Sequence, residues 1–167
     1  MKTGLTIGQT YKFRVQSRND VGFSDYSAEI AVIASTYPKA PVGLLVDRVA
    51  TTANQIGFTW SNGDSNGGSP ILDYRISYDQ AVGNWIVLAT NVIPNYYTSP
   101  MLTSGSTYTF KVEARNIIGY SPTSAAITIL CATNPVAAGA PTSVISGALV
   151  TIDWNTPYNS GSPITSY

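Results

Sequence analysis

Residues 102–119 read Leu102-x-x-Gly105-x-x-Tyr108-x-Phe110-x-Val112-x-Ala114-Arg115-Asn116-x-x-Gly119, and the same pattern has already occurred near the start of the chain. The earlier copy reads Leu5-x-x-Gly8-x-x-Tyr11-x-Phe13-x-Val15-x-Ser17-Arg18-Asn19-x-x-Gly22, with a constant offset of 97 residues and no insertion. A fixed offset that preserves apolar, glycine and turn positions together indicates a repeat architecture. Within each copy, an apolar residue at every second position predicts a strand with one face turned to a core.

A second motif precedes the first in each repeat. It reads Trp60, then Gly68-Ser69-Pro70-Ile71-x-x-Tyr74, and it recurs as Trp154, then Gly161-Ser162-Pro163-Ile164-x-x-Tyr167. The offset is 94 residues at the tryptophan and 93 at the tyrosine, so one residue is lost from the loop between them. All motifs follow one another in uninterrupted order only from about Pro38 to Thr133. We therefore expect residues 1–36 to be the last two strands of one module, 37–133 a complete module, and 134–167 the first part of a third.

Alternation with a period of two dominates the expected complete module. The runs Ile56-x-Phe58-x-Trp60 and Tyr74-x-Ile76-x-Tyr78 place large apolar groups on one face, whereas no segment has a helical period. Short strands separated by Gly- and Pro-rich turns predict an all-β, antiparallel β-sandwich. The predicted core consists of Trp60, Tyr74, Ile76, Leu102, Tyr108, Phe110 and Val112.

These residues resemble the fibronectin type III module, a tandemly repeated immunoglobulin-like sandwich. The resemblance rests on Trp60, on Leu102 six residues before Tyr108, and on Asn116-x-x-Gly119-x-Ser121 in the last hairpin. It implies that Tyr108, and Tyr11 in the earlier copy, form the hydrogen bond that pins the sixth strand at its corner. The Gly-Ser-Pro-Ile loop resembles the version found in long cytoskeletal and giant muscle arrays. Ser99 departs from the family, which usually has an aliphatic residue there, and this predicts a short fifth strand.

Composition excludes several classes of function. Charged residues make up 11% of the chain and the net charge is zero, which argues against a nucleic-acid partner. There is no histidine and a single cysteine, Cys131, so the usual catalytic dyads and zinc sites cannot form. No apolar run is long enough to span a bilayer, and we expect no direct membrane insertion. We therefore predict neither enzyme activity nor a cofactor.

One loop carries a partial calcium motif. Asn62-x-Asp64-x-Asn66-Gly67 matches the first half of an EF-hand loop, with Asp73 at the twelfth position. However, Asn replaces the first Asp, Asp replaces the bidentate Glu, and a strand rather than a helix is expected after Asp73. We interpret Asn62, Asp64, Asn66 and Asp73 as turn and strand residues and expect no bound metal.

Candidate contact residues fall into two groups. The first lies in loops and comprises Ile117 and Tyr120 in the last hairpin and Trp85 after a turn. The second comprises the apolar faces of the two partial modules, which need a cover: Tyr11, Phe13, Val15, Val150, Ile152 and Trp154. On the solvent face of the sheet we expect cross-strand charge pairing, for example between Glu113 and Arg75.

The sequence thus predicts a structural, scaffold or adhesive segment of a multi-module protein in a larger assembly. Its partners would be other protein chains or the rest of the same polypeptide. Two alternatives remain open at this point: a module that recognises a protein or glycan through its end loops, and an accessory domain of a larger secreted enzyme. Both a cytoskeletal or ciliary and an extracellular location are compatible with it. A sharper hypothesis is head-to-tail completion, in which the tail of one chain supplies the first, second and part of the third strand and the head of the next supplies the last two. Only the two edge strands between Tyr167 and Leu5 would then be missing.

Overall fold

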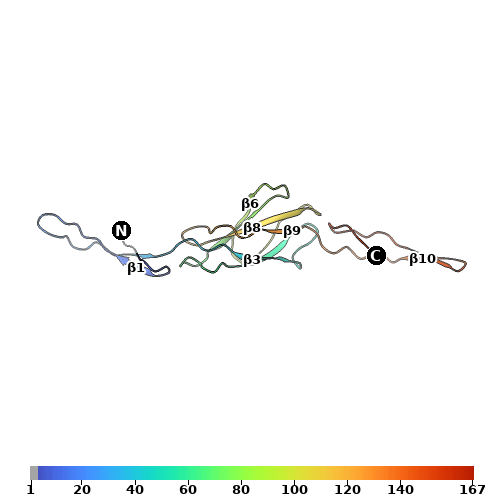
Figure 1. The fold of residues 1–167 in the computed structure, drawn as a ribbon, viewed down its shortest axis with the longest axis horizontal. Helices are drawn as coiled ribbons and strands as arrows, with labels where there is room; N and C mark the ends of the chain where they lie inside the picture. Colours follow the sequence, from blue (N-terminus) through green and yellow to red (C-terminus); the bar gives the residue numbers. More distant parts are fainter. Residues whose placement is uncertain (1–3) are drawn as a thin grey trace.

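The computed structural model describes residues 4–167, in which a central β-sandwich is flanked by one β-hairpin on each side (Figure 1). The strands in chain order are β1 (Thr10–Phe13), β2 (Ile30–Ile33), β3 (Val42–Asp47), β4 (Gly57–Ser61), β5 (Asp73–Tyr78), β6 (Ile86–Val92), β7 (Tyr96–Thr98), β8 (Thr107–Arg115), β9 (Ile127–Leu130), β10 (Thr142–Ser146) and β11 (Leu149–Asp153). The described residues form no helix, and every strand pair is antiparallel. The predicted all-β antiparallel sandwich is confirmed.

Two sheets make up the sandwich. One has the strand order β3-β4-β7 and the other β6-β5-β8-β9. Alternate residues of β4 and β8 point between the sheets, so Phe58 and Phe110 meet with ring centroids 4.9 Å apart. Trp60 packs edge-on against Tyr74 from the other sheet, with centroids 5.2 Å apart. Of the predicted core residues, Leu102 is partly buried against the core and the other six are buried: Trp60, Tyr74, Ile76, Tyr108, Phe110 and Val112.

Strand β9 pairs with only the first half of β8, and serine hydroxyls bond to backbone N–H groups in the second half. The hydroxyl of Ser124 accepts the N–H of Val112, and that of Ser121 accepts the N–H of Ala114, each at 3.0 Å. The chain between Gly119 and β9 is not itself a strand, and these side chains replace the missing backbone acceptors. Ninety-seven residues earlier, the hydroxyl of Ser27 accepts the N–H of Val15, and that of Ser24 accepts the N–H of Ser17.

The corner before β8 is held by a tyrosine hydroxyl. Tyr108 accepts the backbone N–H of Thr103 at 3.0 Å, and Tyr11 accepts that of Thr6 at 2.8 Å. Because the aromatic ring belongs to the strand and the N–H to the preceding loop, the bond fixes where the strand begins.

We expect Tyr108→Phe to lower the free energy of unfolding by about 1 kcal/mol, the net value of a typical hydrogen bond. Tyr78→Phe is the control, since this ring stacks on Tyr108 but its hydroxyl has no hydrogen-bond partner in the described chain. Urea unfolding of both variants measures the difference. Equal losses in the two would show that the hydroxyl of Tyr108 does not hold the corner.

The fifth strand of the central module, β7, is only three residues long. It ends at Thr98, and Ser99 then continues the pairing with the chain before β4. The N–H of Ser99 donates to the carbonyl of Ile56 at 2.9 Å, and the hydroxyl of Ser99 accepts the N–H of Ile56 at 2.9 Å. A side chain thus replaces the strand backbone at this position, and the departure of Ser99 from an aliphatic residue has a structural role.

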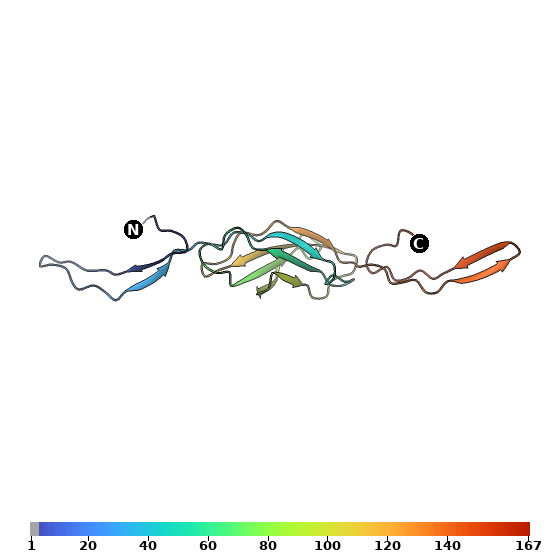
Figure 2. The same cartoon turned by 90° about the horizontal axis from the view of Figure 1, so that it is seen from below.

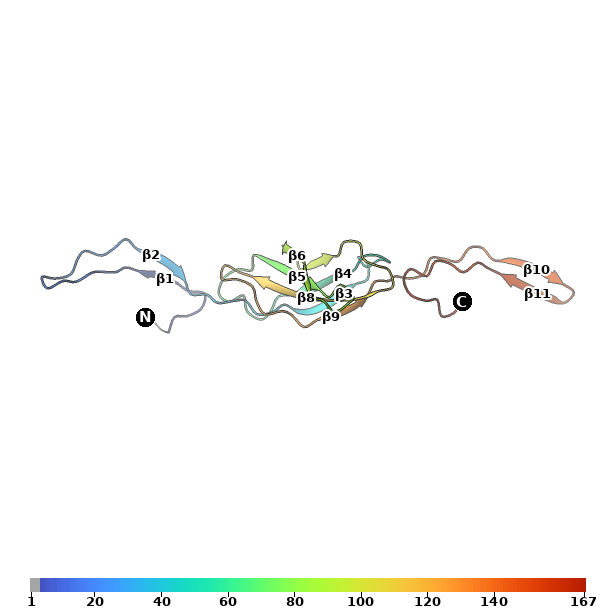
Figure 3. The same cartoon turned by 90° about the horizontal axis from the view of Figure 1, so that it is seen from above.

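The flanking hairpins extend from opposite ends of the sandwich (Figures 2 and 3). One is formed by β1 and β2 and the other by β10 and β11. They have the same strand pairing as β8–β9 and β3–β4, to which the sequence offsets relate them. Their core-type side chains face solvent: Phe13 is 37% and Trp154 46% exposed, and Val15, Val150 and Ile152 are also exposed. Tyr11 is half-buried.

The topology defines which strands a head-to-tail pair would lack. In the central module, the segment equivalent to the interval from Tyr167 to Leu5 in a head-to-tail pair contains the rest of β5 after Tyr74, together with β6 and β7. Strand β5 is not at an edge, because it is bonded to β6 on one side and β8 on the other. Strands β6 and β7 are edge strands of their sheets, as expected, and the pair would in addition lack the part of β5 that follows the equivalent of Tyr74. Such a pair would keep Tyr167 as the counterpart of Tyr74 and would lack a counterpart of Ile76 in the core.

Candidate functional site: the joint between linker and loops

The segment that leads from the first hairpin into the sandwich lies against loops of the sandwich. The N–H of Thr36 donates to the carbonyl of Gly67 at 2.8 Å, and the N–H of Lys39 donates to that of Ser65 at 2.8 Å. Pro38, between them, is fully buried. We call residues 36–40 the linker, and the contact it makes with loops 62–68 and 116–119 the first joint. These bonds hold the linker to the module as an added strand would be held.

Asn116 joins three parts of the chain. Its side-chain Nδ2 donates to the carbonyls of Thr36 at 2.8 Å and Asn66 at 2.9 Å. Its Oδ1 accepts the N–H groups of Ile118 and Gly119 in its own turn, at 2.9 and 3.2 Å. The residue is 2% exposed. Because this buried amide uses both its donor hydrogens and its acceptor oxygen, it holds the linker, the loop at Asn66 and its own turn in fixed positions.

Glycines allow the backbones to approach at the joint. Gly68 has a φ of +82°, and a Cβ there would lie 2.5 Å from the backbone nitrogen of Gly8. Such a distance is too short for any side chain, so only glycine fits this contact. Gly119 is constrained similarly, since a Cβ would lie 2.8 Å from the ring of Tyr37.

The same joint forms at the other end of the sandwich. The N–H of Thr133 donates to the carbonyl of Ser160, and the N–H of Val136 donates to that of Tyr158, both at 3.0 Å. The donors lie 97 residues after Thr36 and Lys39, and the acceptors 93 residues after Gly67 and Ser65, as the two sequence offsets require. The glycine contact recurs as well, between Gly105 and Gly161. We call this contact the second joint.

Sequence reasoning missed the joint residues, although a signal for the glycine contact was present. Gly8 recurs as Gly105 with the first offset, and Gly68 recurs as Gly161 with the second. Glycines retained under two different offsets could have indicated two backbones that meet. Nothing in the sequence pointed to the bond between Asn116 and the linker, because the two lie 80 residues apart.

Charged side chains form a ladder on the outer face of β5 and β8. Arg75 donates to both oxygens of Glu113, at 2.6 and 2.8 Å, so the predicted pairing of these neighbours is confirmed. Arg115 binds Asp73 in the same bidentate way. The hydrogen bonds from Arg75 to Glu113 and from Arg115 to Asp73 raise the pKa values of the two guanidinium groups. The ring of Tyr120 lies against both guanidinium groups.

The loop candidates differ in how available they are. The guanidinium of Arg75 stacks 4.0 Å from the centroid of the Tyr120 ring, and Arg115 lies 5.5 Å from it, so this tyrosine is half-buried. Ile117 is 67% exposed. Trp85 is partly covered by the ammonium group of Lys111, 4.0 Å from the ring centroid. Only Ile117 therefore presents a largely free side chain.

The four candidate metal ligands are engaged in hydrogen bonds or separated. The side-chain oxygen of Asn62 accepts the hydroxyl of Tyr74, and the carboxylate of Asp73 is held by Arg115. The side-chain oxygen of Asn66 accepts the N–H of Gly68 at 2.9 Å. Within residues 4–167, no three acidic, cysteine or histidine side chains gather in a group able to hold a metal. Asp64 therefore does not belong to such a group among the described residues.

Calcium titration of the chain should produce no saturable heat at micromolar to millimolar concentrations, the range over which loops of this kind bind. The physical reason is that binding would require Asp73 to leave the guanidinium of Arg115. Isothermal calorimetry measures it, with Asp64→Ala as the control. A saturable heat that disappears in Asp64→Ala would establish a metal site.

Cys131 is fully buried, and burial raises the pKa of its thiol. Its sulfur makes a weak hydrogen bond to the carbonyl of Ala53 at 3.5 Å. A protonated, buried thiol is a poor nucleophile, so the residue acts as a packing group.

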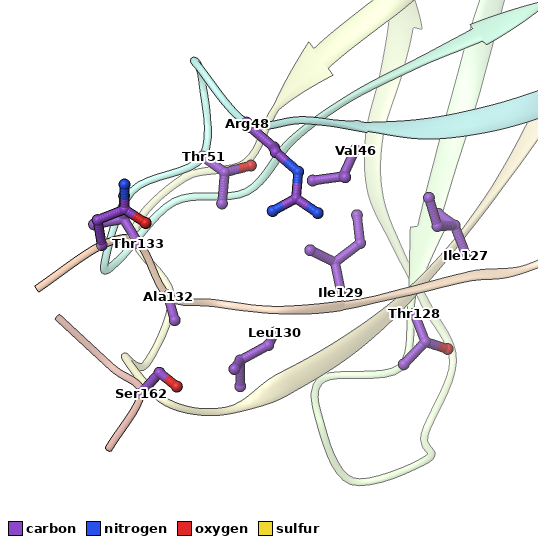
Figure 4. A pocket seen from close by; sticks show the side chains of 11 residues that line it. Val46, Arg48, Thr51, Ile127, Thr128, Ile129, Leu130, Ala132, Thr133 and Ser162 are labelled. Atoms are coloured by element: carbon purple, nitrogen blue, oxygen red, sulfur yellow. The ribbon is translucent and has the colours of Figure 1, made fainter. Parts of the chain in front are cut away.

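A cleft of about 500 Å³ opens between the edges of β3 and β9 (Figure 4). The side chain of Arg48 extends over it toward Val46 and Ile129. The buried hydroxyl of Thr51 already donates to the carbonyl of Asp47 at 2.7 Å. The charged group at the cleft is the exposed guanidinium of Arg48, and the buried hydroxyl of Thr51 already has a partner. These side chains do not indicate which ligand the cleft would bind.

Known proteins share both the fold and the sequence pattern. The family model described as fibronectin type III domain matches residues 39–129. The chain is 37% identical over 122 residues to M-protein of striated muscle from Gallus gallus and, equally, to myomesin-2 from Homo sapiens. Each match covers 70% of this chain and 8% of the relative, so the chain spans a small part of those proteins. Human fibronectin type-III domain-containing protein 3A is 27% identical over 98% of this chain, which corresponds to 14% of that protein.

Among solved structures, titin domains A168-A170 superpose with a TM-score of 0.63 at 22% identity, covering 77% of this chain and 43% of that one. This likeness shows the fold. No helix in the described part of the chain is long and apolar enough to cross a membrane. Because the family model covers more than half of the sequence and the structure has the corresponding sandwich, the chain belongs to the fibronectin type III family.

Proposed function

We propose that this chain is a spacer segment of a tandem array, in which each module sets the distance between its neighbours within a larger protein assembly. In this proposal, residues 1–36 are the last strands of one module, 37–133 a complete module and 134–167 the first part of the next. The segment has no enzyme activity of its own. Its partners are the rest of the same polypeptide and other protein chains.

The two joints carry this proposal. They use equivalent backbone atoms at both ends of the sandwich, so each module would meet the next through the same contacts. A repeated joint places successive modules in a repeated orientation, which is what a spacer requires. The hairpins support the same view, because their exposed apolar faces need the remaining strands of a module to cover them.

The relatives add support for the kind of array. M-protein of striated muscle and myomesin-2 are similar to this chain over 70% of the chain's length. The Gly-Ser-Pro-Ile loop supports the assignment to the variant found in long arrays. In the first joint this loop follows directly after Gly67, whose carbonyl receives the linker.

Deletion of residues 37–133 tests the spacer role in the polypeptide that contains this segment. The deletion removes 97 residues, so Thr36 takes the place of Thr133 and the second joint can re-form with the linker sequence of the following module. Fluorescent tags on either side of the segment report the spacing, and co-purification reports assembly.

We expect the assembly to persist with the tags closer together by one module. A control deletion of residues 60–156 starts within β4 and ends beyond β11, so it removes the same number of residues but disrupts both sheets. It should abolish folding of the segment. Loss of partner binding in the in-register deletion with unchanged tag spacing would contradict the spacer role and favour recognition through the end loops.

A further inference from the structure

We propose that loops 62–68 and 116–119 form a receptor for the linker, and that the side chain of Asn116 is the latch that fixes the orientation of one module on the next. This inference deepens the proposed spacer role and rests on it for its biological meaning. The contacts themselves belong to this chain and can be tested without the parent polypeptide.

The amide of Asn116 is suited to this role because each of its groups has a separate task. The Oδ1 atom shapes the turn by accepting two N–H groups, and this requires only an acceptor. The Nδ2 atom reaches outside the turn and holds the carbonyl of Thr36 in the linker beside the carbonyl of Asn66 in the loop. The second task requires a donor with two hydrogens, which an amide supplies and a carboxylate does not.

The chain contains an internal comparison for the latch. Among the described residues, the second joint has the two backbone bonds and the glycine contact of the first, but no side-chain amide is bonded to its linker segment. Within residues 4–167, the two joints thus differ by the hydrogen bond of an amide side chain to the linker. In the second joint, Ser160 replaces Gly67 and adopts a φ of +52°, a conformation that non-glycine residues rarely adopt.

Asn19 provides the matched control residue. It occupies the same position in the first hairpin, and its Oδ1 accepts the N–H groups of Val21 and Gly22 at 3.0 and 3.1 Å. Its Nδ2 has no partner among the described residues. Asn19→Asp thus changes an equivalent turn without touching a linker.

Hydrogen exchange measured by NMR tests the latch, with the N–H groups of Thr36 and Lys39 as reporters of the first joint. In the unmodified chain we expect both to exchange more slowly than those of Thr133 and Val136 in the second joint. Asn116→Asp should accelerate exchange at Thr36 by about tenfold or more, since it removes the donor and places a carboxylate beside two carbonyls. Asn19→Asp should leave Thr36 unchanged.

The N–H of Val112 in the core distinguishes loss of the latch from loss of the fold. If its exchange also accelerates in Asn116→Asp, Asn116→Ser is read instead, because serine keeps an acceptor for the turn and lacks the amide donor. Acceleration at Thr36 with Val112 unchanged supports the latch in either variant. Unchanged exchange at Thr36, or acceleration at Val112 in both variants, overturns it.

A second pair of variants tests the receptor surface through its glycine contact. Gly68→Ala introduces a Cβ against Gly8, whereas Gly83→Ala introduces one where nothing lies within 4 Å, at a nearly equal φ of +80°. Backbone strain is therefore matched, and only Gly68→Ala should accelerate exchange at Thr36. Equal effects of both would assign the change to strain and overturn the receptor. A failed latch leaves the outcome of the module deletion unaffected, so the two proposals fail separately.

Discussion

Trp60→Ala should lower the free energy of unfolding by about 3–5 kcal/mol, the range for truncation of large aromatic residues in a core. The ring of Trp60 is 4% exposed and packs between Phe58, at 5.7 Å between centroids, and Tyr74. The indole N–H is buried and has no hydrogen-bond partner among residues 4–167. The loss thus comes from packing and the cavity left behind, and Trp60→Phe should cost considerably less.

Guanidinium unfolding followed by circular dichroism measures the effect, and the repeat supplies the control. Trp154 occupies the equivalent position in β11's hairpin and is 46% exposed, so Trp154→Ala should cost less than about 1 kcal/mol in this chain. Equal losses at the two positions would mean that the third segment has a buried core of its own in solution, contrary to the exposure of its hairpin.

Ser99→Ala should lower the free energy of unfolding by about 1–3 kcal/mol, the cost of leaving a buried donor without a partner. The N–H of Ile56 donates to the hydroxyl of Ser99, and both residues are almost completely buried. Water therefore cannot replace the lost acceptor. Ser61→Ala, at the exposed end of β4, should have little effect.

Ser99→Val separates this explanation from a simple lack of apolar volume. Valine restores the aliphatic character usual at this position in the family, but it has no acceptor for the N–H of Ile56. We expect it to be no more stable than Ser99→Ala in urea unfolding. A Ser99→Val variant more stable than the unmodified chain would show that the hydroxyl is a defect rather than a structural acceptor.

Much of the fold could be predicted because its signals are local. The alternation around Phe110 and around Phe58 defines which side chains enter the core, since successive side chains of a strand point to opposite faces. The neighbouring pair Arg75 and Glu113 followed from the same pattern. By contrast, the position of β5 between β6 and β8 could not be read from its residues, because edge and central strands share the same alternation.

The partial calcium motif shows how a local pattern can be insufficient. Asn62, Asp64 and Asp73 have a spacing that resembles a ligand set, yet spacing does not determine where side chains are directed. Asp73 begins a strand that runs beside β8, and this places its carboxylate against Arg115. Its partner is thus determined by strand pairing across 42 residues.

The sequence by itself determined the strands, the repeat and its two offsets, because each depends on the order of residues along the chain. Only the tertiary structure decided the joints. Thr36, Asn66 and Asn116 are far apart in sequence, and they meet because the sandwich brings its end loops together. Their contacts use backbone carbonyls and the absence of a side chain at Gly68, neither of which produces a hydrophobic or charge pattern. Which residues contact one another in the joint therefore depends on their positions in space, and the sequence alone indicated only that its glycines recur.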